Sequence, residues 1–325
     1  MKINRPNKIV GFVCVLILTF SISERLIADK KGSTDSIVSV ANNGIDSPTC
    51  GDWNEPCRSI TQAIANSVDG DRIQVGPGYY GDINGNGILG DAGEEAVVNN
   101  CNCMILVDKQ LRLESLRGAE HTILDAKGLV DTIVTIEAEG VVFGGRQKGF
   151  TLLNAEFSGL TAISQGVLVE GNQAVSNGAV GFFIGGNNHK FARNSAIRNG
   201  QGFFISGSGH RLSHNIALGN DDAGFYISAT NVEMSRNASI GNRLAGIFMG
   251  FGDARIERNN LYGNEAGSDN CGLRNFSDAT IVATNNYWGA PTGPGPDPAD
   301  AVCDFGTSIT ITVPFAIGEW YVLVD

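Results

Sequence analysis

Hydrophobic and polar positions repeat with a nearly constant period between Asn172 and Asn264. Each unit holds three short runs in which apolar and polar residues alternate, and asparagine and glycine separate the runs. Five asparagines mark the period at spacings of 22, 21, 22 and 22 residues, and a second asparagine follows each of them by 5 residues. The two series are Asn172, Asn194, Asn215, Asn237 and Asn259, and then Asn177, Asn199, Asn220, Asn242 and Asn264. A fixed period of this size predicts a solenoid.

The short runs predict strands. Period-two alternation is typical of a strand, and no window carries ten residues of the 3.6-residue apolar spacing of a helix. Three strands per turn, each pairing with its equivalent one turn on, make a parallel β-helix that rises about 4.8 Å per rung. The usual handedness of parallel crossovers predicts right-handed winding. We therefore predict an all-β fold, a single-stranded right-handed parallel β-helix.

The repeated asparagines and glycines have structural explanations. The first asparagine of each unit is expected at the bend between the second and third strands. There its amide can bond the amides of neighbouring rungs, and asparagine also tolerates left-handed backbone. We favour such internal ladders over ligand binding. Four glycines are expected just before the first strands, at turns that need positive φ or close backbone approach. They are Gly181, Gly202, Gly224 and Gly246.

The chain before the repeats predicts a capped end. Residues 59–66 are expected to form a short helix with Ser59 as N-cap and with Ile60, Ala63 and Ile64 on one face. Such a helix would cover the first rung, whose open edge could otherwise pair with another chain.

Composition predicts an exported protein. Lys2, Arg5 and Lys8 precede an apolar run at residues 9–20, as in a signal peptide, which we place at 1–28. No other segment is apolar and long enough to span a membrane. We expect one β-helix domain at 29–325, with an N-terminal cap at about 36–80, an insertion at 82–96, regular repeats at about 150–275 and a C-terminal cap at about 276–325. The expected location is secreted, cell surface or periplasmic.

Two further segments carry a family resemblance. Residues 46–80 contain Cys-Gly-Asp at 50–52 and Gly-Asp-Arg-Ile at 70–73, and residues 285–289 read Asn-Asn-Tyr-Trp-Gly. With the repeats, they resemble the right-handed parallel β-helix repeat family, the pectin-lyase-like superfamily, over most of the mature chain. That superfamily includes lyases, hydrolases, epimerases, copper-site accessory proteins and adhesins. The resemblance therefore implies a fold but not a chemistry.

Six cysteines remain if Cys14 leaves with the signal peptide, as an oxidising compartment favours. We expect Cys50 to pair with Cys57, and Cys271 with Cys303. Cys101 and Cys103 stand two apart, so a bond between them would be strained, and we leave open whether they pair or bind a metal.

Alternation along the first strands sends four aromatic side chains outward, in register. They are Phe183, Phe204, Tyr226 and Phe248. Large exposed apolar patches mark interaction sites. The resemblance implies that this face is the substrate groove of carbohydrate-active members, where the rings could stack on sugars. Alternatively, the rings stabilise the sheet as a ladder or pack against a partner.

Candidate catalytic residues near this face are few. Asp221 and Asp222 lie in a turn, and Arg274 follows the aromatic stripe. A lyase needs a base and a hydrolase needs a carboxylate pair. An Asp-Asp pair in a turn also has a plain structural explanation. We find none of the multi-residue signatures of uronate epimerases or polygalacturonases.

The net charge of −11 and the isoelectric point of about 4.8 argue against nucleic-acid binding. Lys190, Arg211 and Arg255 fall in register on the second strands and could attract an acidic polymer, although we favour ordinary solvated surface.

Residues 82–88 match the first half of a calcium loop. Asp82, Asn84 and Asn86 alternate as oxygen ligands before Gly87, and Asp91 follows. Position twelve is glycine, which departs from the standard loop, so a flexible insertion is the alternative. Calcium is the one cofactor that the sequence suggests.

Three functions remain open. The stripe favours binding of an extracellular polysaccharide or a cell-surface glycan. A polysaccharide lyase or glycoside hydrolase, and a non-catalytic adhesive surface protein, are the alternatives. The sequence leaves the glycan and the oligomeric state open.

Overall fold

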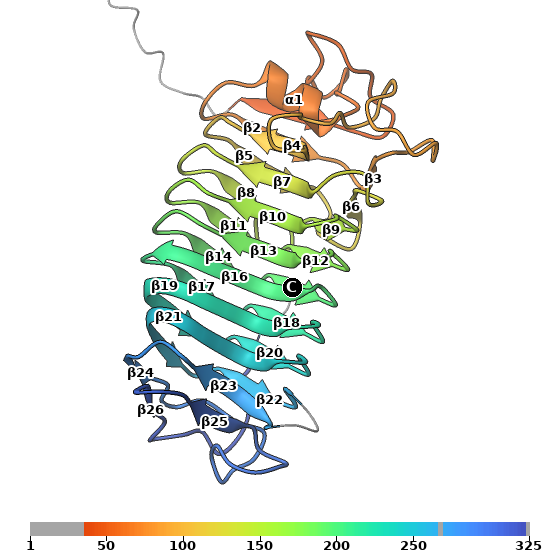
Figure 1. Ribbon diagram of the computed structural model, residues 1–325. Helices are drawn as coiled ribbons and strands as arrows, with labels where there is room; N and C mark the ends of the chain where they lie inside the picture. Colours follow the sequence, from red (N-terminus) through yellow and green to blue (C-terminus); the bar gives the residue numbers. More distant parts are fainter. Residues whose placement is uncertain (1–35, 266–268, 323–325) are drawn as a thin grey trace, which may run out of the picture. The chain divides into compact units, whose positions relative to one another are not determined.

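The computed structural model describes residues 36–265 and 269–322, so the predicted signal peptide lies outside the described residues. These described residues form one compact unit. Its strands stack turn upon turn along one axis (Figure 1), and every pairing between the named strands is parallel. The predicted right-handed parallel β-helix is confirmed.

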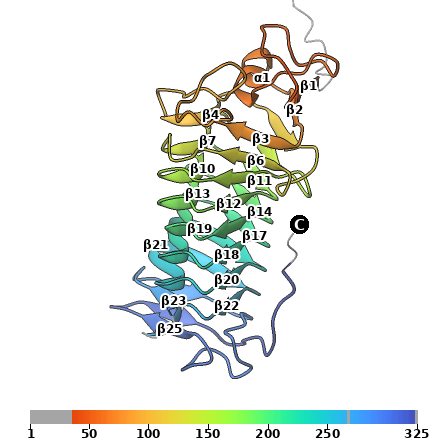
Figure 2. The same cartoon turned by 90° about the vertical axis from the view of Figure 1, so that its right-hand side faces the viewer.

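Three rows of strands run along the coil, and Figure 2 shows the third row from the side. The first row comprises β4 (Cys103–Val107), β7 (Thr132–Ile136), β10 (Ser158–Ala162), β13 (Val180–Ile184), β16 (Gln201–Ser208), β23 (Cys271–Asn275) and β25 (Ala301–Asp304). The second comprises β1 (Ile37–Val40), β2 (Arg72–Val75), β5 (Arg112–Ser115), β8 (Val142–Gly144), β11 (Leu168–Glu170), β14 (Lys190–Ala192), β17 (Arg211–Ser213), β24 (Thr280–Val282) and β26 (Ile309–Ile311). The third comprises β3 (Gly78–Gly81), β6 (Thr122–Asp125), β9 (Thr151–Leu153), β12 (Gln173–Val175), β15 (Ser195–Ile197), β18 (Ile216–Leu218), β20 (Ala238–Ile240) and β22 (Asn260–Tyr262). Two long strands, β19 (Ala223–Ser235) and β21 (Ala245–Glu257), belong to both the first and the second row.

The core consists of columns of identical positions on successive rungs. Phe182, Phe203 and Phe225 pair in register and are fully buried. Their ring centroids lie 5.0 and 4.7 Å apart, close to the strand spacing. This column points inward, on the opposite side of the strands from the aromatic residues that alternation sends outward.

Both asparagine ladders are present. In the first, the side-chain amide of Asn194 donates to Oδ1 of Asn215 over 3.1 Å, and Asn215 donates to Asn237 over 3.0 Å. In the second, Asn199 donates to Asn220 over 3.2 Å in the same way. The residues with left-handed backbone differ from those expected. In four of the repeats the residue just before the first asparagine has it, namely Arg193, His214, Arg236 and Arg258, with φ of 55 to 59°.

The predicted glycine column lies inside the first-row strands, for example at Gly181 in β13 and Gly202 in β16. The expected positive φ is wrong, because none of the four glycines has it. Close approach is the actual reason: a Cβ on Gly202 would lie 2.4 Å from the carbonyl oxygen of Gly224 and 3.0 Å from the Asn220 amide. Glycine thus makes room for the second asparagine ladder.

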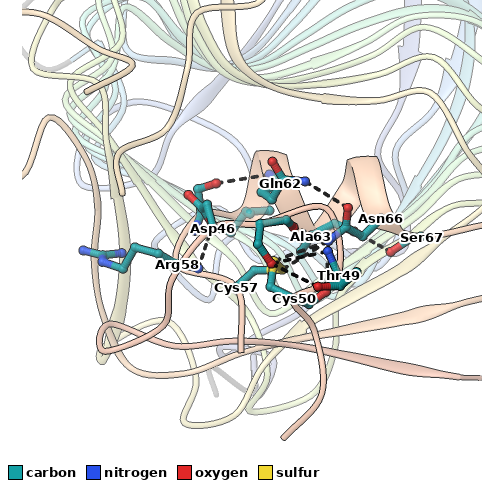
Figure 3. The surroundings of a disulfide bond; sticks show 12 residues. Asp46, Thr49, Cys50, Cys57, Arg58, Gln62, Ala63, Asn66 and Ser67 are labelled. Carbon is teal, nitrogen blue, oxygen red and sulfur yellow. Dashed lines mark hydrogen bonds between the residues drawn. A yellow bond between two sulfur atoms is a disulfide. The ribbon is translucent and has the colours of Figure 1, made fainter. Parts of the chain in front are cut away.

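The predicted capping helix is α1 (Ile60–Asn66), and Figure 1 shows it at one end of the stacked strands. The hydroxyl of Ser59 accepts a hydrogen bond from the backbone N–H of Gln62, so Ser59 is the N-cap. Figure 3 shows Asn66, at the helix end, beside the disulfide between Cys50 and Cys57, and its amide donates to the Cys50 carbonyl over 2.9 Å. The helix and the disulfide therefore hold each other in place.

The other two disulfides join Cys271 to Cys303 and Cys101 to Cys103. The first was expected. The second resolves the state of Cys101 and Cys103, which the sequence left open, and it leaves no thiolate there for a metal.

Candidate functional site

The four predicted outward aromatics form one continuous stack on the first row of strands. The ring centroids of Phe183 and Phe204 lie 5.1 Å apart, those of Phe204 and Tyr226 5.2 Å, and those of Tyr226 and Phe248 4.8 Å. All four side chains are partly buried, whereas their inward neighbours are fully buried. We call these rings and their continuation the aromatic stack.

The stack continues beyond the predicted residues. Phe276 lies 5.3 Å from Phe248, and Phe305 lies 4.1 Å from Phe276. The sequence analysis ended the stripe at Arg274, because Arg274 is the residue in register with Phe248. Phe276 stands two residues further along and still reaches the stack. No periodic signal in the sequence marks Phe276 or Phe305.

Ring orientation limits what the stack can bind. Neighbouring rings are parallel to within 16°, and their centroids are about one strand spacing apart. Parallel rings at this distance lie partly over one another. The two faces of each inner ring are therefore covered by its neighbours. Solvent meets mainly ring edges. A row of sugars stacked on the inner ring faces, as the sequence suggested, is therefore not available. Phe183 differs because its partner on the preceding rung is Thr161, which has no ring.

A cavity of about 470 Å³ lies where the stack begins. It is lined by Phe157, Ala179, Val180, Phe183, Gly200, Gln201, Phe204, Asp221 and Asp222. Two of the four predicted aromatic residues, Phe183 and Phe204, thus share one cavity with both predicted acids, although they come from different rungs. The sequence analysis missed Phe157, which is 46% exposed, and Gln201. Phe157 directly precedes β10 and Gln201 is the first residue of β16, so both stand where the chain enters a first-row strand.

The two acids in this cavity have different partners. Oδ2 of Asp222 accepts a hydrogen bond from the Gln201 amide over 2.7 Å, which fixes both side chains at the wall. Asp221 lies 3.4 Å from Arg243 in an ion pair whose two side chains are more than 70% exposed. An exposed pair of this kind contributes little stability. Asp221 can therefore turn towards a ligand at low cost.

Arg274 is not part of this cavity. It lies on β23, two rungs beyond β19, at whose start Asp221 and Asp222 stand. Its guanidinium contacts both carboxylate oxygens of Glu265 and lies 3.3 Å from Asp269. It also lies over the ring of Phe305, 6.0 Å from the centroid. These contacts give Arg274 a structural explanation, as a clamp at the far end of the stack.

The proposed calcium ligands lie far along the chain from this cavity, between β3 and β4. The side-chain amides of Asn84 and Asn86 both donate to Oδ2 of Asp91, over 2.8 and 2.7 Å. Asp82 is buried, and its carboxylate accepts from the backbone N–H groups of Gly85 and Gly87. The four residues that the sequence proposed are thus gathered in one loop.

Other charged residues of the repeats have mutual partners. Arg211 pairs with Glu233 at 3.0 Å and Arg255 with Glu257 at 2.9 Å on the second row. This supports solvated surface over a basic binding stripe. His189 and His210 are fully buried and stacked, as expected of core histidines. Burial lowers the pKa of His189 from its usual 6.5 to about 4, so the ring is neutral near pH 7.

Comparison with known proteins identifies the fold. Residues 140–287 match the family described as right handed beta helix region. Among solved structures, pectate lyase Pel9A is similar with a TM-score of 0.58 and 18% identity, over 87% of this chain and 78% of that chain. A rhamnogalacturonan lyase is similar with a TM-score of 0.53 and 11% identity, over 86% of this chain and 87% of that chain. No curated protein sequence matches this chain.

The protein has the right-handed parallel β-helix fold. At these identities the two lyases share the fold, and the fold alone does not assign a reaction. Among the described residues, no helix has the length and apolar character needed to cross a membrane.

Proposed function

We propose that this protein binds an extracellular polysaccharide in the cavity at the start of the aromatic stack. The observation that carries the proposal is the cavity itself, where the apolar surface of Phe157, Phe183 and Phe204 meets the polar groups of Gln201, Asp221 and Asp222. Sugars have apolar C–H faces and polar hydroxyl edges, and binding sites for small ligands combine apolar walls with a few placed polar groups. Phe183 provides apolar surface at the cavity, and the two carboxylates provide acceptors for hydroxyl groups.

The solenoid supports an extended ligand over a compact one. The cavity lies beside strands that repeat along the axis, and the outer edges of the stack continue from it past Tyr226 and Phe248. The two similar structures are, by their names, a pectate lyase and a rhamnogalacturonan lyase. Polysaccharide is therefore the ligand class that geometry and fold jointly support. The three disulfides favour an oxidising location, secreted, cell surface or periplasmic.

A lyase or a glycoside hydrolase is the second candidate, with Asp221 and Asp222 as the acids of the cavity. A hydrolase needs two carboxyl groups on opposite sides of the scissile bond, about 5 to 10 Å apart. Two adjacent residues of one turn offer no such opposed pair. A lyase needs a base near the sugar, and Arg274 is held by Glu265 at the other end of the stack. Binding without reaction therefore accounts for more of the site.

An adhesive surface protein is the third candidate, in which the stack packs against another chain. It has the same exposed ring edges in its favour, but it does not explain the acids and Gln201 at the cavity wall.

A glycan panel tests the proposal by measuring both retention of the protein and release of unsaturated or reducing-end products. We expect retention on at least one acidic or neutral polysaccharide without product. Phe204→Ala should weaken that retention, whereas Phe251→Ala should not, because Phe251 is 62% exposed and lies outside the cavity lining. Products that disappear in Asp222→Asn would instead establish an enzyme. Absence of both retention and products would contradict the proposal and favour the adhesive role.

A further inference from the structure

We propose that the loop at residues 82–94, between β3 and β4, is a binding site for one calcium ion. The first observation is the path of the chain around Asp82, which is only 4% exposed. Its two carboxylate oxygens accept hydrogen bonds from the backbone N–H groups of Gly85 and Gly87, over 2.7 and 3.0 Å. The loop therefore wraps around this carboxylate, as a calcium loop wraps around its first ligand.

The second observation is a carboxylate oxygen without a partner. Glu94 is 95% buried, being 5% exposed, and its Oε1 accepts from the backbone N–H groups of Ile83 and Asn84 over 3.0 Å each. Its Oε2 is buried and has no hydrogen-bond partner. An unpartnered buried carboxylate oxygen is costly, and a cation is the group that would satisfy it. Because Oε1 already contacts the residues next to Asp82, the free oxygen belongs to this loop and not to a neighbouring element.

The third observation is convergence. Asn84 and Asn86 both direct their side-chain amides at Oδ2 of Asp91, over 2.8 and 2.7 Å. The carbonyl oxygens of the same two amides accept hydrogen bonds from the backbone N–H groups of Asn86 and Ile88, over 2.8 Å each, and each keeps one lone pair for a cation. Asn84, Asn86 and Asp91 thus gather amide and carboxylate oxygens in one short loop. Oxygen ligands from carboxylates and amides in a flexible ring are what calcium prefers, and magnesium demands a stricter octahedron.

The local charge also requires a cation. Asp82, Asp91 and Glu94 bring three carboxylates to the loop, and Nζ of Lys127 lies 3.5 Å from Oδ2 of Asp82. Glu95 does not share the site, because its two oxygens accept from the backbone N–H groups of Ile60 and Thr61 at the start of α1. A divalent ion would balance the remaining charge of the loop. Since Glu94 and Glu95 are adjacent, the ion would also steady the chain that holds the capping helix.

The test is titration of the full-length, chelator-treated protein with CaCl₂ by calorimetry, with thermal unfolding measured in parallel. We expect one ion per chain, with a dissociation constant on the order of 10⁻⁴ M, as for extracellular calcium modules. Saturating CaCl₂ should raise Tm by several degrees, because the ion binds only the folded chain. MgCl₂ should have a much smaller effect. An equal effect of the two ions, or no heat with CaCl₂, would overturn the proposal.

Three variants locate the site. Glu94→Gln removes the unpartnered oxygen and should weaken calcium binding at least tenfold. Asp91→Asn changes an exposed residue that holds no backbone group through its side chain, so it should fold normally and also bind more weakly. Glu137→Gln removes the same charge from an exposed position elsewhere and should bind like the unaltered chain. Wild-type affinity in both Glu94→Gln and Asp91→Asn would place any bound calcium outside this loop.

Discussion

Asp300 takes the place of an asparagine at the end of the second ladder, directly beyond Asn264. Its Oδ2 accepts hydrogen bonds from the side-chain amide and the backbone N–H of Asn264, over 2.8 and 3.2 Å. Its Oδ1 accepts from the backbone N–H of Gly263 over 2.8 Å. One carboxylate thus satisfies three donors that would face empty space where the repeats end, and a neutral amide offers only one acceptor oxygen for them.

This cap makes stability depend on pH. Burial raises the pKa of Asp300 from its usual 3.8 to about 6, against the opposing effect of the bonds from Asn264. A group whose pKa is higher in the folded chain contributes most stability below its unfolded pKa, and this is lost as pH rises through the folded pKa. Between pH 4 and 7 the loss should be about 2 kcal/mol. Urea unfolding at both pH values measures the free energy of unfolding. From pH 4 to pH 7, the free energy of unfolding of Asp300→Asn should rise by that amount relative to the unaltered chain. Asp131→Asn, an exposed control, should show no such change; an equal gain there would contradict the assignment.

His189 should affect stability over an overlapping pH range, with the opposite sign. Nδ1 of His189 accepts the backbone N–H of Val167 over 3.1 Å, and its Nε2 contacts the Gly185 carbonyl oxygen. Because burial lowers the pKa of His189 to about 4, the unfolded chain takes up the proton first as pH falls below 6.5. Stability should decrease by about 2 kcal/mol between pH 7 and 5. His189→Asn keeps an acceptor for Val167 and should remove this decrease, whatever its stability at pH 7. An unchanged pH profile in the variant would show that other groups cause the acid sensitivity.

The asparagine ladders should carry a large share of the stability. Asn215 accepts from the backbone N–H and the side-chain amide of Asn194 and donates to the carbonyl oxygen of Phe191 and to Asn237. Asn215→Ala leaves several of these buried groups without a partner. Each such group costs about 1 to 3 kcal/mol, so we expect a loss of about 3 to 5 kcal/mol.

Denaturant unfolding measures this loss, and Asn43→Ala is the matched control. Asn43 is exposed, and its replacement should change stability by less than about 0.5 kcal/mol. A loss of similar size in both variants would contradict the ladder as a source of stability.

The sequence predicts the regular part of this fold well because the asparagine period records the stacking directly. Beyond Asn264 the period breaks: the first ladder continues at Asn286, 27 residues after Asn259, and the second at Asp300, 36 residues after Asn264. A residue that satisfies the ladder from an irregular segment has no signal in the spacing. Phe276 and Phe305 could not be predicted for the same reason, because both lie in irregular segments beyond Asn264.

The candidate site was predicted only in part. Alternation places Phe183 and Phe204 outside, but it does not fix the plane of a ring, and the ring planes decide whether a sugar can stack. Asp222 was recognised as a polar residue near the face, whereas its bond to Gln201 and the cavity that both line depend on contacts between rungs. Such contacts follow from the three-dimensional path of the turns, which vary from unit to unit.

The orientation of the rings separates two ways in which a polysaccharide could use the stack. Phe183 lines the cavity and has no ring on the preceding rung, whereas Tyr226 is sandwiched between Phe204 and Phe248. If the ligand binds in the cavity, Phe183→Ala should weaken retention on the polysaccharide at least tenfold, a loss of about 1.4 kcal/mol. Tyr226→Ala should mainly lower stability, by about 1 to 3 kcal/mol, because it interrupts two stacked pairs. Affinity electrophoresis and denaturant unfolding of both variants measure the two effects side by side. If Tyr226→Ala, still folded, loses retention as strongly as Phe183→Ala, the ligand lies along the ring edges of the whole stack and the cavity is only its beginning.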